Sequence, residues 1–333
     1  MTLLHIDPIA EQTPLGGLER WLHDPTVSEV IVNGGSDVWI ERDGRLQLVG
    51  RMRVDTVMLA LERILAPAGR RLDRSHPSVD ARLADGSRLC AAIPPIAVDG
   101  PCVAIRRFAT RPIALDQFGA PPVAAVLRDT VARRCNVLVS GATSAGKTTL
   151  LNSLAQLASP HERLITLEDV AELRLPHPHV VRLETRDPTP DGVDGIDLAQ
   201  LLRTALRLRP DRLVVGEIRG HEAMHLLQAL NTGHDGSLAT IHANSALDAL
   251  MRLSTLVLQS APSWPWAAVQ HTVARAVDVV VHVARSHDGC RTVDEIVEVV
   301  EPQESSNLGG AQLRVSPIVR RGELVGELSN ART

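Results

Sequence analysis

Alternating apolar and polar residues dominate the first third of the chain, where they predict short strands. The dipeptides Asp43-Gly44 and Asp85-Gly86 each separate two such stretches and are typical of hairpin turns. Together these signals predict a small α+β domain over residues 1–110. The strands expected there are 28–33, 38–42, 46–49, 79–83, 88–93 and 103–108, and the helices are 18–23 and 55–65.

The pattern changes after a stretch rich in proline and glycine, residues 111–122, which we interpret as a linker. Beyond it, apolar strands alternate with helices, and this order predicts a doubly wound, mainly parallel α/β sheet in a domain over residues 123–333. Residues 305–310 carry Ser, Asn and Gly and are expected to be loosely ordered. The strands expected are 136–140, 164–167, 180–183 and 213–215, and the helices include 123–134 and 147–158.

Composition indicates a soluble globular protein of 333 residues, with 44% hydrophobic and 22% charged residues. A net charge of −4 and an aromatic content of only 2% argue against direct nucleic-acid binding. The four cysteines include no C-x-x-C pair, so a structural zinc site is not expected. Cys90 and Cys102 could meet across a hairpin, but free thiols are the preferred interpretation. No signal peptide and no long apolar run is found, which predicts a cytoplasmic protein.

Lys147 is the only lysine in the chain, and it lies in the pattern G-x-x-x-x-G-K-[ST] over residues 141–148. An apolar strand precedes this loop and a helix follows it, which is the context that a phosphate-binding loop requires. We expect Lys147 to bridge the β- and γ-phosphates of ATP, and the Thr148 hydroxyl to hold Mg²⁺. The residues expected to bind the nucleotide are Gly141, Ala142, Thr143, Ser144, Ala145, Gly146, Lys147, Thr148 and Thr149.

Three further motifs place polar groups at or after strand ends, where ligands of α/β sheets bind. Glu168 follows one strand and could orient the attacking water, although a solvated strand end is the alternative. Glu217 ends an apolar strand and has the form of a Walker B acid that supports Mg²⁺. Arg219 could simply pair with a nearby carboxylate. His242 is a candidate phosphate sensor, and His234 is as easily a structural histidine.

Taken in order, these motifs resemble those of the type II and type IV secretion traffic ATPases. The matching segments are the phosphate loop, Leu167-Glu-Asp169, Gly216-Glu-Ile-Arg-Gly220 and the histidine block 232–244. The likeness is greatest to the branch that assembles tight-adherence (Tad) pili, and it covers nearly the whole chain. In the first domain it is carried by 22–33, 79–88, 93–95 and 105–108, and it continues in 206–213.

The resemblance implies a RecA-like P-loop domain and a ring-shaped homo-hexamer, with ATP bound between the two domains at each subunit boundary. It implies that Glu168 polarises the water, that Glu217 is the Walker B acid and that His242 contacts the γ-phosphate. It further implies that Arg88 and Arg106 approach the phosphates. Arg107 is an alternative to Arg106, and a surface charge on the hairpin is the alternative for Arg88.

Two departures from the family pattern affect the expectations. Ala142 and Ala145 stand where the family often has glycine, so a less permissive phosphate loop is expected. The zinc-binding cysteine pairs of some type II ATPases are missing, which points away from that branch.

The sequence therefore predicts a Mg²⁺-dependent ATPase at the inner face of the cytoplasmic membrane. It would act on an inner-membrane platform protein to assemble a pilus or move a substrate. The alternatives are a hexameric nucleic-acid translocase and a nucleotide-switched scaffold without turnover.

Overall fold

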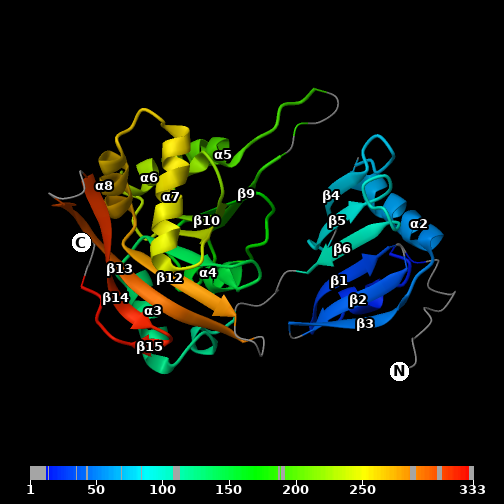
Figure 1. Ribbon diagram of the computed structural model, residues 1–333, viewed down its shortest axis with the longest axis horizontal. Helices are drawn as coiled ribbons and strands as arrows, with labels where there is room; N and C mark the ends of the chain where they lie inside the picture. The colour runs from blue at the N-terminus through cyan, green and yellow to red at the C-terminus, as the bar shows by residue number, and fades with distance from the viewer. Residues whose placement is uncertain are drawn as a thin grey trace. The chain divides into compact units, whose positions relative to one another are not determined.

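The computed structural model divides the chain into two compact units, Met1–Thr110 and Arg111–Thr333 (Figure 1). Residues 108–112, which carry the expected end of one strand and part of the expected linker, lie outside the residues that the structure describes. Described are residue 13 and residues 15–34, 36–42, 44–68, 70–83, 85–107, 113–186, 188, 192–285, 290–305 and 310–329.

The first unit is a six-stranded sheet in the order β3-β2-β1-β6-β5-β4, with antiparallel pairing throughout. Helix α2 has buried residues at Val57, Leu61 and Leu65, a helical spacing that packs one face against Val30 and Ile105 of the sheet. Its elements are α1 (Glu19–Leu22), β1 (Val27–Asn33), β2 (Asp37–Arg42), β3 (Arg45–Arg51), α2 (Val54–Leu65), β4 (Ser78–Arg82), β5 (Arg88–Ala92) and β6 (Cys102–Arg106).

The register between β5 and β6 keeps the two cysteines apart, since Cys90 lies opposite Ala104 and Cys102 lies opposite Ala92. Both are free thiols, in agreement with the preferred interpretation of the sequence.

The second unit contains a nine-stranded sheet in the order β15-β14-β13-β12-β7-β11-β10-β8-β9. The six strands β12, β7, β11, β10, β8 and β9 run parallel to one another. Strands β13, β14 and β15 extend the sheet beyond β12 by antiparallel pairing. The strands are β7 (Val137–Gly141), β8 (Leu164–Glu168), β9 (Val180–Glu184), β10 (Arg212–Ile218), β11 (Leu238–His242), β12 (Val279–Arg285), β13 (Arg291–Ser305), β14 (Gly310–Arg320) and β15 (Glu323–Leu324).

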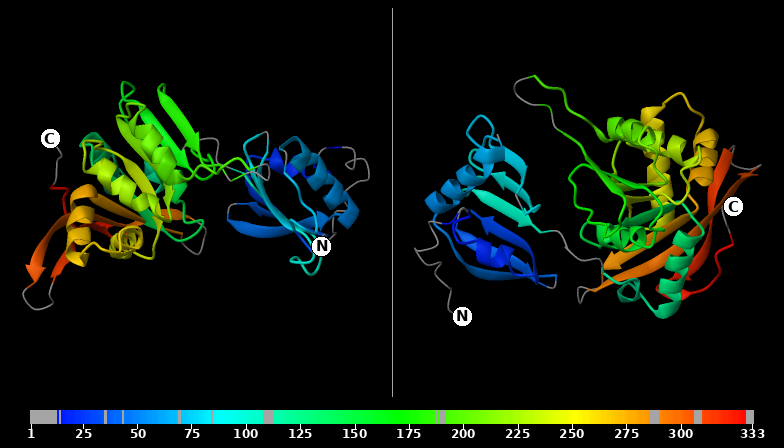
Figure 2. Two further views of the ribbon diagram at one scale, coloured as in Figure 1. Left: turned by 90° about the horizontal axis from the view of Figure 1, so that it is seen from above. Right: turned by 180° about the vertical axis from the view of Figure 1, so that it is seen from behind.

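Helices cover both faces of this sheet, which Figure 2 shows from two further sides. Alternate residues of β7 enter different cores: Val137 and Val139 pack with α3 and α4, and Leu138 packs with α5, α6, α7 and α8. The helices are α3 (Pro121–Ala132), α4 (Lys147–Ala155), α5 (Leu198–Leu206), α6 (Glu222–Leu230), α7 (Ala246–Ser260) and α8 (Trp266–Ala276). Among the described residues, no helix combines the length and apolar character needed to cross a bilayer.

The main differences from the expected elements lie in the last third of the chain. Strands β12 to β15 were not expected, and they form an antiparallel extension of the sheet. Ser305 and Gly310 pair across β13 and β14, so the ends of the stretch expected to be loose belong to strands. The residues between them, 306–309, lie outside the described ranges. Helix α3 begins at Pro121, because proline fits the first turn of a helix, where its missing N–H costs nothing.

Candidate functional site

The loop over residues 141–147 connects β7 to α4 and is bounded by two glycines that the backbone requires. Gly146 has φ +107°, a left-handed conformation that favours glycine, and it directly precedes α4. A Cβ on Gly141 would overlap the carbonyl oxygen of Val283. Neither Ala142 nor Ala145 has a positive φ, so the alanines fit the loop without strain. The expectation that the loop is less permissive than a glycine-rich one stays a prediction.

Lys147 lies at the start of α4 with its side chain folded back into the loop. Its Nζ donates to the carbonyl oxygens of Gly141, at 3.1 Å, and Ala142, at 2.9 Å, and lies 3.2 Å from His242 Nδ1. His242 reaches this position because β11 pairs with β7 in a register that puts His242 opposite Gly141. The structure thus brings together the lysine and the histidine that the sequence predicted to share a phosphate site.

Glu217, near the end of β10, continues this line of polar groups. His242 Nε2 lies 3.2 Å from Glu217 Oε1. Arg219 donates to both Glu217 carboxylate oxygens, with Nε at 2.6 Å and Nη2 at 3.0 Å, and its Nη1 lies 3.5 Å from Asp169. Burial acts to raise the pKa of Glu217, but the Arg219 hydrogen bonds and the charges of Arg219, His242 and Lys147 outweigh it and lower that pKa.

The ring of His242 works as a neutral link between Lys147 and Glu217. Burial lowers its pKa, the charge of Lys147 lowers it further, and Glu217 only partly opposes them. In the neutral ring one nitrogen accepts and the other donates. The geometry assigns Nδ1 as the acceptor from Lys147 and Nε2–H as the donor to Glu217. This row therefore connects the phosphate loop to β10 through the His242 ring.

Glu168 ends β8 and is only 2% exposed. Its Oε1 accepts the backbone N–H groups of Glu172 and Leu173, both at 2.9 Å. Among the described residues, its Oε2 and the Thr166 hydroxyl on the same face of β8 are buried without a hydrogen-bond partner. Burial raises the pKa of Glu168 to about 7, although the two backbone donors oppose it. Such a carboxyl can accept and release a proton near neutral pH.

Gly216 provides the space that Glu168 occupies. A Cβ added to Gly216 would lie 2.9 Å from Glu168 Cγ, closer than side chains pack. Residue 216 is therefore a glycine because any larger side chain would displace Glu168 on the neighbouring strand β8.

Mg²⁺ prefers oxygen ligands and retains several waters, so two protein oxygens beside phosphates are enough to hold it. The Thr148 hydroxyl, in the first turn of α4, and the Glu217 carboxylate are oxygen donors of this kind. They fit the chemistry of the metal. The described part of the chain contains no group of three or more His, Cys, Asp or Glu side chains that could hold a metal ion by themselves.

Arg88 and Arg106 lie in the first unit and face each other across β5 and β6. Arg88 has an ion pair with Asp80 at 3.3 Å, and Arg106 is exposed. The guanidinium of Arg107 instead donates to the carbonyl oxygens of Asp24 and Val27 in its own unit. These bonds favour Arg106 over Arg107 as the arginine available to a ligand, and the approach of Arg88 and Arg106 to phosphate stays a prediction.

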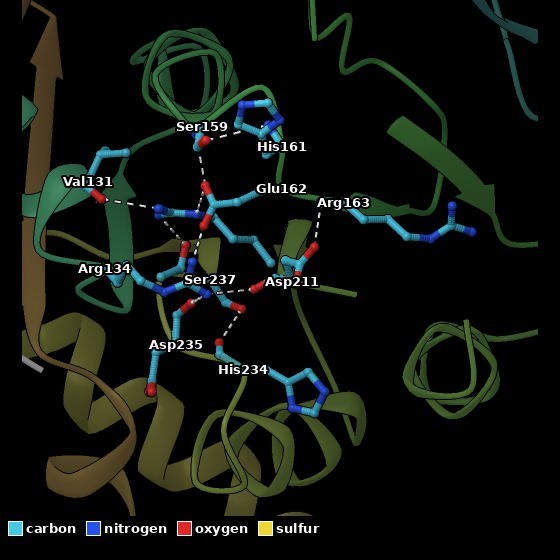
Figure 3. Close-up of polar contacts among 12 residues, drawn as sticks. Val131, Arg134, Ser159, His161, Glu162, Arg163, Asp211, His234, Asp235 and Ser237 are labelled. Carbon is cyan, nitrogen blue, oxygen red and sulfur yellow. Dashed lines mark hydrogen bonds and ion pairs between the residues drawn. The ribbon is translucent and has the colours of Figure 1, made fainter. Parts of the chain in front are cut away.

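His234 is not part of the phosphate site. It precedes β11, whose far end carries His242, so a strand of about 16 Å separates the two histidines. The His234 ring lies 3.0 Å from the carbonyl oxygen of Ala229, and its own carbonyl accepts from the Ser237 hydroxyl (Figure 3). The structure therefore assigns it a structural role.

At the amino-terminal ends of β8 and β10 lies an ion network that sequence analysis missed, in which Glu162 and Arg212 are buried and Arg134 is partly exposed (Figure 3). Glu162 pairs with Arg134 and with Arg212, the latter at 3.0 Å. Arg212 also donates to the Gly236 carbonyl, and a Cβ on Gly236 would lie 2.5 Å from its guanidinium. In the sequence each of these charges looks like a solvated residue beside a strand, and only the fold shows that they meet.

Known proteins resemble this chain over most of its length. The family profile described as Type II/IV secretion system protein matches residues 11–321. A Mycobacterium tuberculosis (strain H37Rv) protein whose name refers to conjugal transfer, Rv3659c, is 40% identical over 300 residues, covering 86% of this chain and 84% of the relative. Conjugal transfer protein TrbB of Rhizobium radiobacter is 36% identical over 288 residues, covering 84% of this chain and 85% of TrbB.

The X-ray structure of the ATPase DotB from Legionella pneumophila has a similar fold. The two structures match with a TM-score of 0.64 at 20% sequence identity, over 90% of this chain and 85% of DotB. The expected fold class, a mainly parallel α/β domain after a smaller α+β domain, is confirmed.

Proposed function

The chain belongs to the type II/IV secretion system protein family, and on that premise we propose that it is the motor of a type IV secretion or conjugal-transfer machine. Membership of this family of secretion ATPases makes the chain an enzyme that hydrolyses ATP, as the sequence predicted. The observation that carries the proposal is the continuous row Lys147–His242–Glu217–Arg219, which joins three neighbouring segments at the phosphate loop.

Nucleotide binding rests on the loop and the first turn of α4. The backbone N–H groups after Gly146 and the Lys147 ammonium hold the phosphates, and Thr148 with Glu217 would hold Mg²⁺. When bound, the metal would neutralise charge on the phosphate oxygens. Lys147 exchanges its present carbonyl partners for phosphate oxygens, and His242, 3.2 Å from its Nζ, then responds to the γ-phosphate.

Hydrolysis requires a group that orients water and takes its proton. Glu168 fits because its Oε2 has no partner among the described residues and its pKa lies near 7. A water oxygen bonds to the γ-phosphorus, its proton passes to Glu168, and the bond to the ADP oxygen breaks with its electron pair going to ADP. Glu168 then returns the proton to the released phosphate or to solvent.

The assembly around the chain is part of the proposal. A homo-hexameric ring would let Arg88 and Arg106 stabilise phosphate charge, and the motor would act from the cytoplasmic face on an inner-membrane platform protein. Family membership supports this arrangement. Assignment to the Tad pilus branch stays a prediction, since the relatives described above are named for conjugal transfer. Neighbouring genes for prepilins would favour the Tad branch.

Two variants test the proposal through phosphate release and nucleotide binding by the full chain. Lys147→Ala should abolish turnover, and Glu168→Gln should slow it while leaving ATP binding largely intact. Arg128→Gln, on the surface of α3, is the control.

Full activity in Lys147→Ala would refute the assignment. Binding without turnover in the wild-type chain, even with membranes present, would favour a nucleotide-switched scaffold. Stimulation by DNA with salt-dependent binding would favour a nucleic-acid translocase.

A further inference from the structure

The hairpin of β12 and β13 lies against both ends of the phosphate loop. The Val283 carbonyl of β12 blocks any Cβ at Gly141, and the Arg291 side chain of β13 does the same at Gly146. A Cβ on Gly146 would lie 2.6 Å from Arg291 Cδ, 3.2 Å from Cγ and 3.4 Å from Nε. Arg291 therefore extends over the loop at the residue where α4 begins and phosphate is expected to bind.

The fold holds Arg291 in this place. Strand β12 runs parallel to β7, with His282 opposite Ser140, so it ends at the same sheet edge as the phosphate loop. The antiparallel return puts Arg291 opposite Arg285 at that edge. Two residues later, the buried Val293 donates its N–H to the Phe118 carbonyl at 2.7 Å, which anchors the start of β13.

Two cations thus approach the loop from different sides. In the sheet, β7 lies between β11 and β12. Lys147 directs its ammonium towards His242 on β11, and Arg291 comes from the β12–β13 side. An arginine adds a planar fork of donors that matches phosphate oxygens, which a lysine ammonium does not supply.

We propose that Arg291 is a further nucleotide-binding residue, whose guanidinium holds the phosphate chain of ATP and ADP from the β13 side of the loop. The proposal rests on the nucleotide site described above. It adds to that site a cationic contact from the same subunit, supplied by the antiparallel extension of the sheet and distinct from the predicted contacts of Arg88 and Arg106.

A purely structural role makes a different prediction, because the aliphatic stem of Arg291 alone could cover Gly146. Arg291→Met keeps an unbranched stem and removes the charge, and Arg291→Lys keeps a charge without the fork. Arg320→Met is the matched control, since Arg320 is an exposed arginine on the adjacent strand β14, opposite Glu295.

The test is ADP affinity of the full chain by titration calorimetry at low and moderate salt, with thermal melts of the nucleotide-free variants. We expect Arg291→Met to weaken ADP binding about tenfold or more and to flatten its salt dependence, as the loss of a charged hydrogen bond predicts. Arg291→Lys should lose less, and Arg320→Met should bind as the wild-type chain does. All three should melt at the wild-type temperature.

Wild-type ADP affinity in Arg291→Met would overturn the proposal. Equal losses in the Met and Lys variants, together with lowered melting temperatures, would assign Arg291 to loop structure and also overturn it. Absence of ADP binding by the wild-type chain would instead overturn the nucleotide site itself, so the two failures are distinguishable.

Discussion

Removing Glu162 should destabilise the second unit far more than removing a surface carboxylate. Glu162 accepts from Arg212 Nε at 3.0 Å, pairs with Arg134 and accepts the Ser159 N–H at 2.8 Å. Arg212 is 4% exposed, so Glu162→Ala leaves a buried guanidinium without its counter-charge. Breaking a buried pair in this way costs about 3–5 kcal/mol.

The structure places the expected cost at the lower end of that range. Arg212 keeps two carbonyl acceptors, Gly236 at 3.1 Å and Val131 at 3.2 Å, so about 3 kcal/mol is expected. For a domain of this size, that free energy lowers the melting temperature by about 6–12 °C. Circular dichroism reports mainly on this unit, because it holds the helices from α3 to α8.

Asp116→Ala provides the comparison, since Asp116 pairs with Arg128 on the surface of the same unit at 2.9 Å. An exposed pair contributes only about 0–1 kcal/mol. If Glu162→Ala melts no lower than Asp116→Ala, the network is not buried as described. A second check is Glu162→Leu combined with Arg212→Met, which should melt above Glu162→Ala because no unpaired charge remains.

Three further predictions concern Glu168. Its ionised form acts as the base, so turnover should fall as pH drops through about 7, and a rate independent of pH between 6 and 8 would contradict the raised pKa. Because the pKa of Glu168 is raised in the folded chain, its ionised form opposes folding above pH 7. Glu168→Gln should therefore raise the melting temperature at pH 8. This gain in melting temperature should shrink as the pH falls through 7. Gly216→Ala should displace the Glu168 side chain and lower kcat about tenfold or more with little change in ATP affinity, measured by steady-state kinetics. Gly220→Ala, whose added Cβ meets only the Glu222 carboxylate at 3.2 Å, should keep most activity, and equal losses in both variants would contradict the argument.

The carboxyl-terminal strand ends were predictable because local sequence carries their signal. A short apolar run followed by Gly141, Glu168, Glu217 or His242 predicts both a strand and a polar group at its end. Parallel pairing then brings those ends to one edge of the sheet, and the register confirms that His242 lies opposite Gly141. A pair between Arg219 and a nearby carboxylate was an alternative that the sequence left open, and the structure shows it with Glu217 and Asp169.

What the sequence did not predict depends on contacts between distant segments. Glu162 and Arg212 are 50 residues apart and meet only when β8 and β10 pair. Strands β12 to β15 follow two helices without the alternation that marks a βα unit, so their pairing with β7 has no local signal. For the same reason Arg291 could not be connected with Gly146, which it covers.

The two edges of the large sheet therefore have separate physical tasks. At the amino-terminal edge, the half-exposed Arg134 and the buried Glu162 and Arg212 hold the starts of β8 and β10 by ion pairs. At the other edge the same strands present Glu168 and Glu217, whose pKa values are shifted in opposite directions. Among the described residues, the hydrogen-bond partners of this network include none of the groups at the phosphate loop, so substitutions at the first edge should change stability with little effect on kcat. Substitutions at the second edge should change kcat, and Glu168→Gln should in addition raise the melting temperature above pH 7. A variant such as Glu162→Gln that changed kcat without changing melting temperature would show that the edges are coupled.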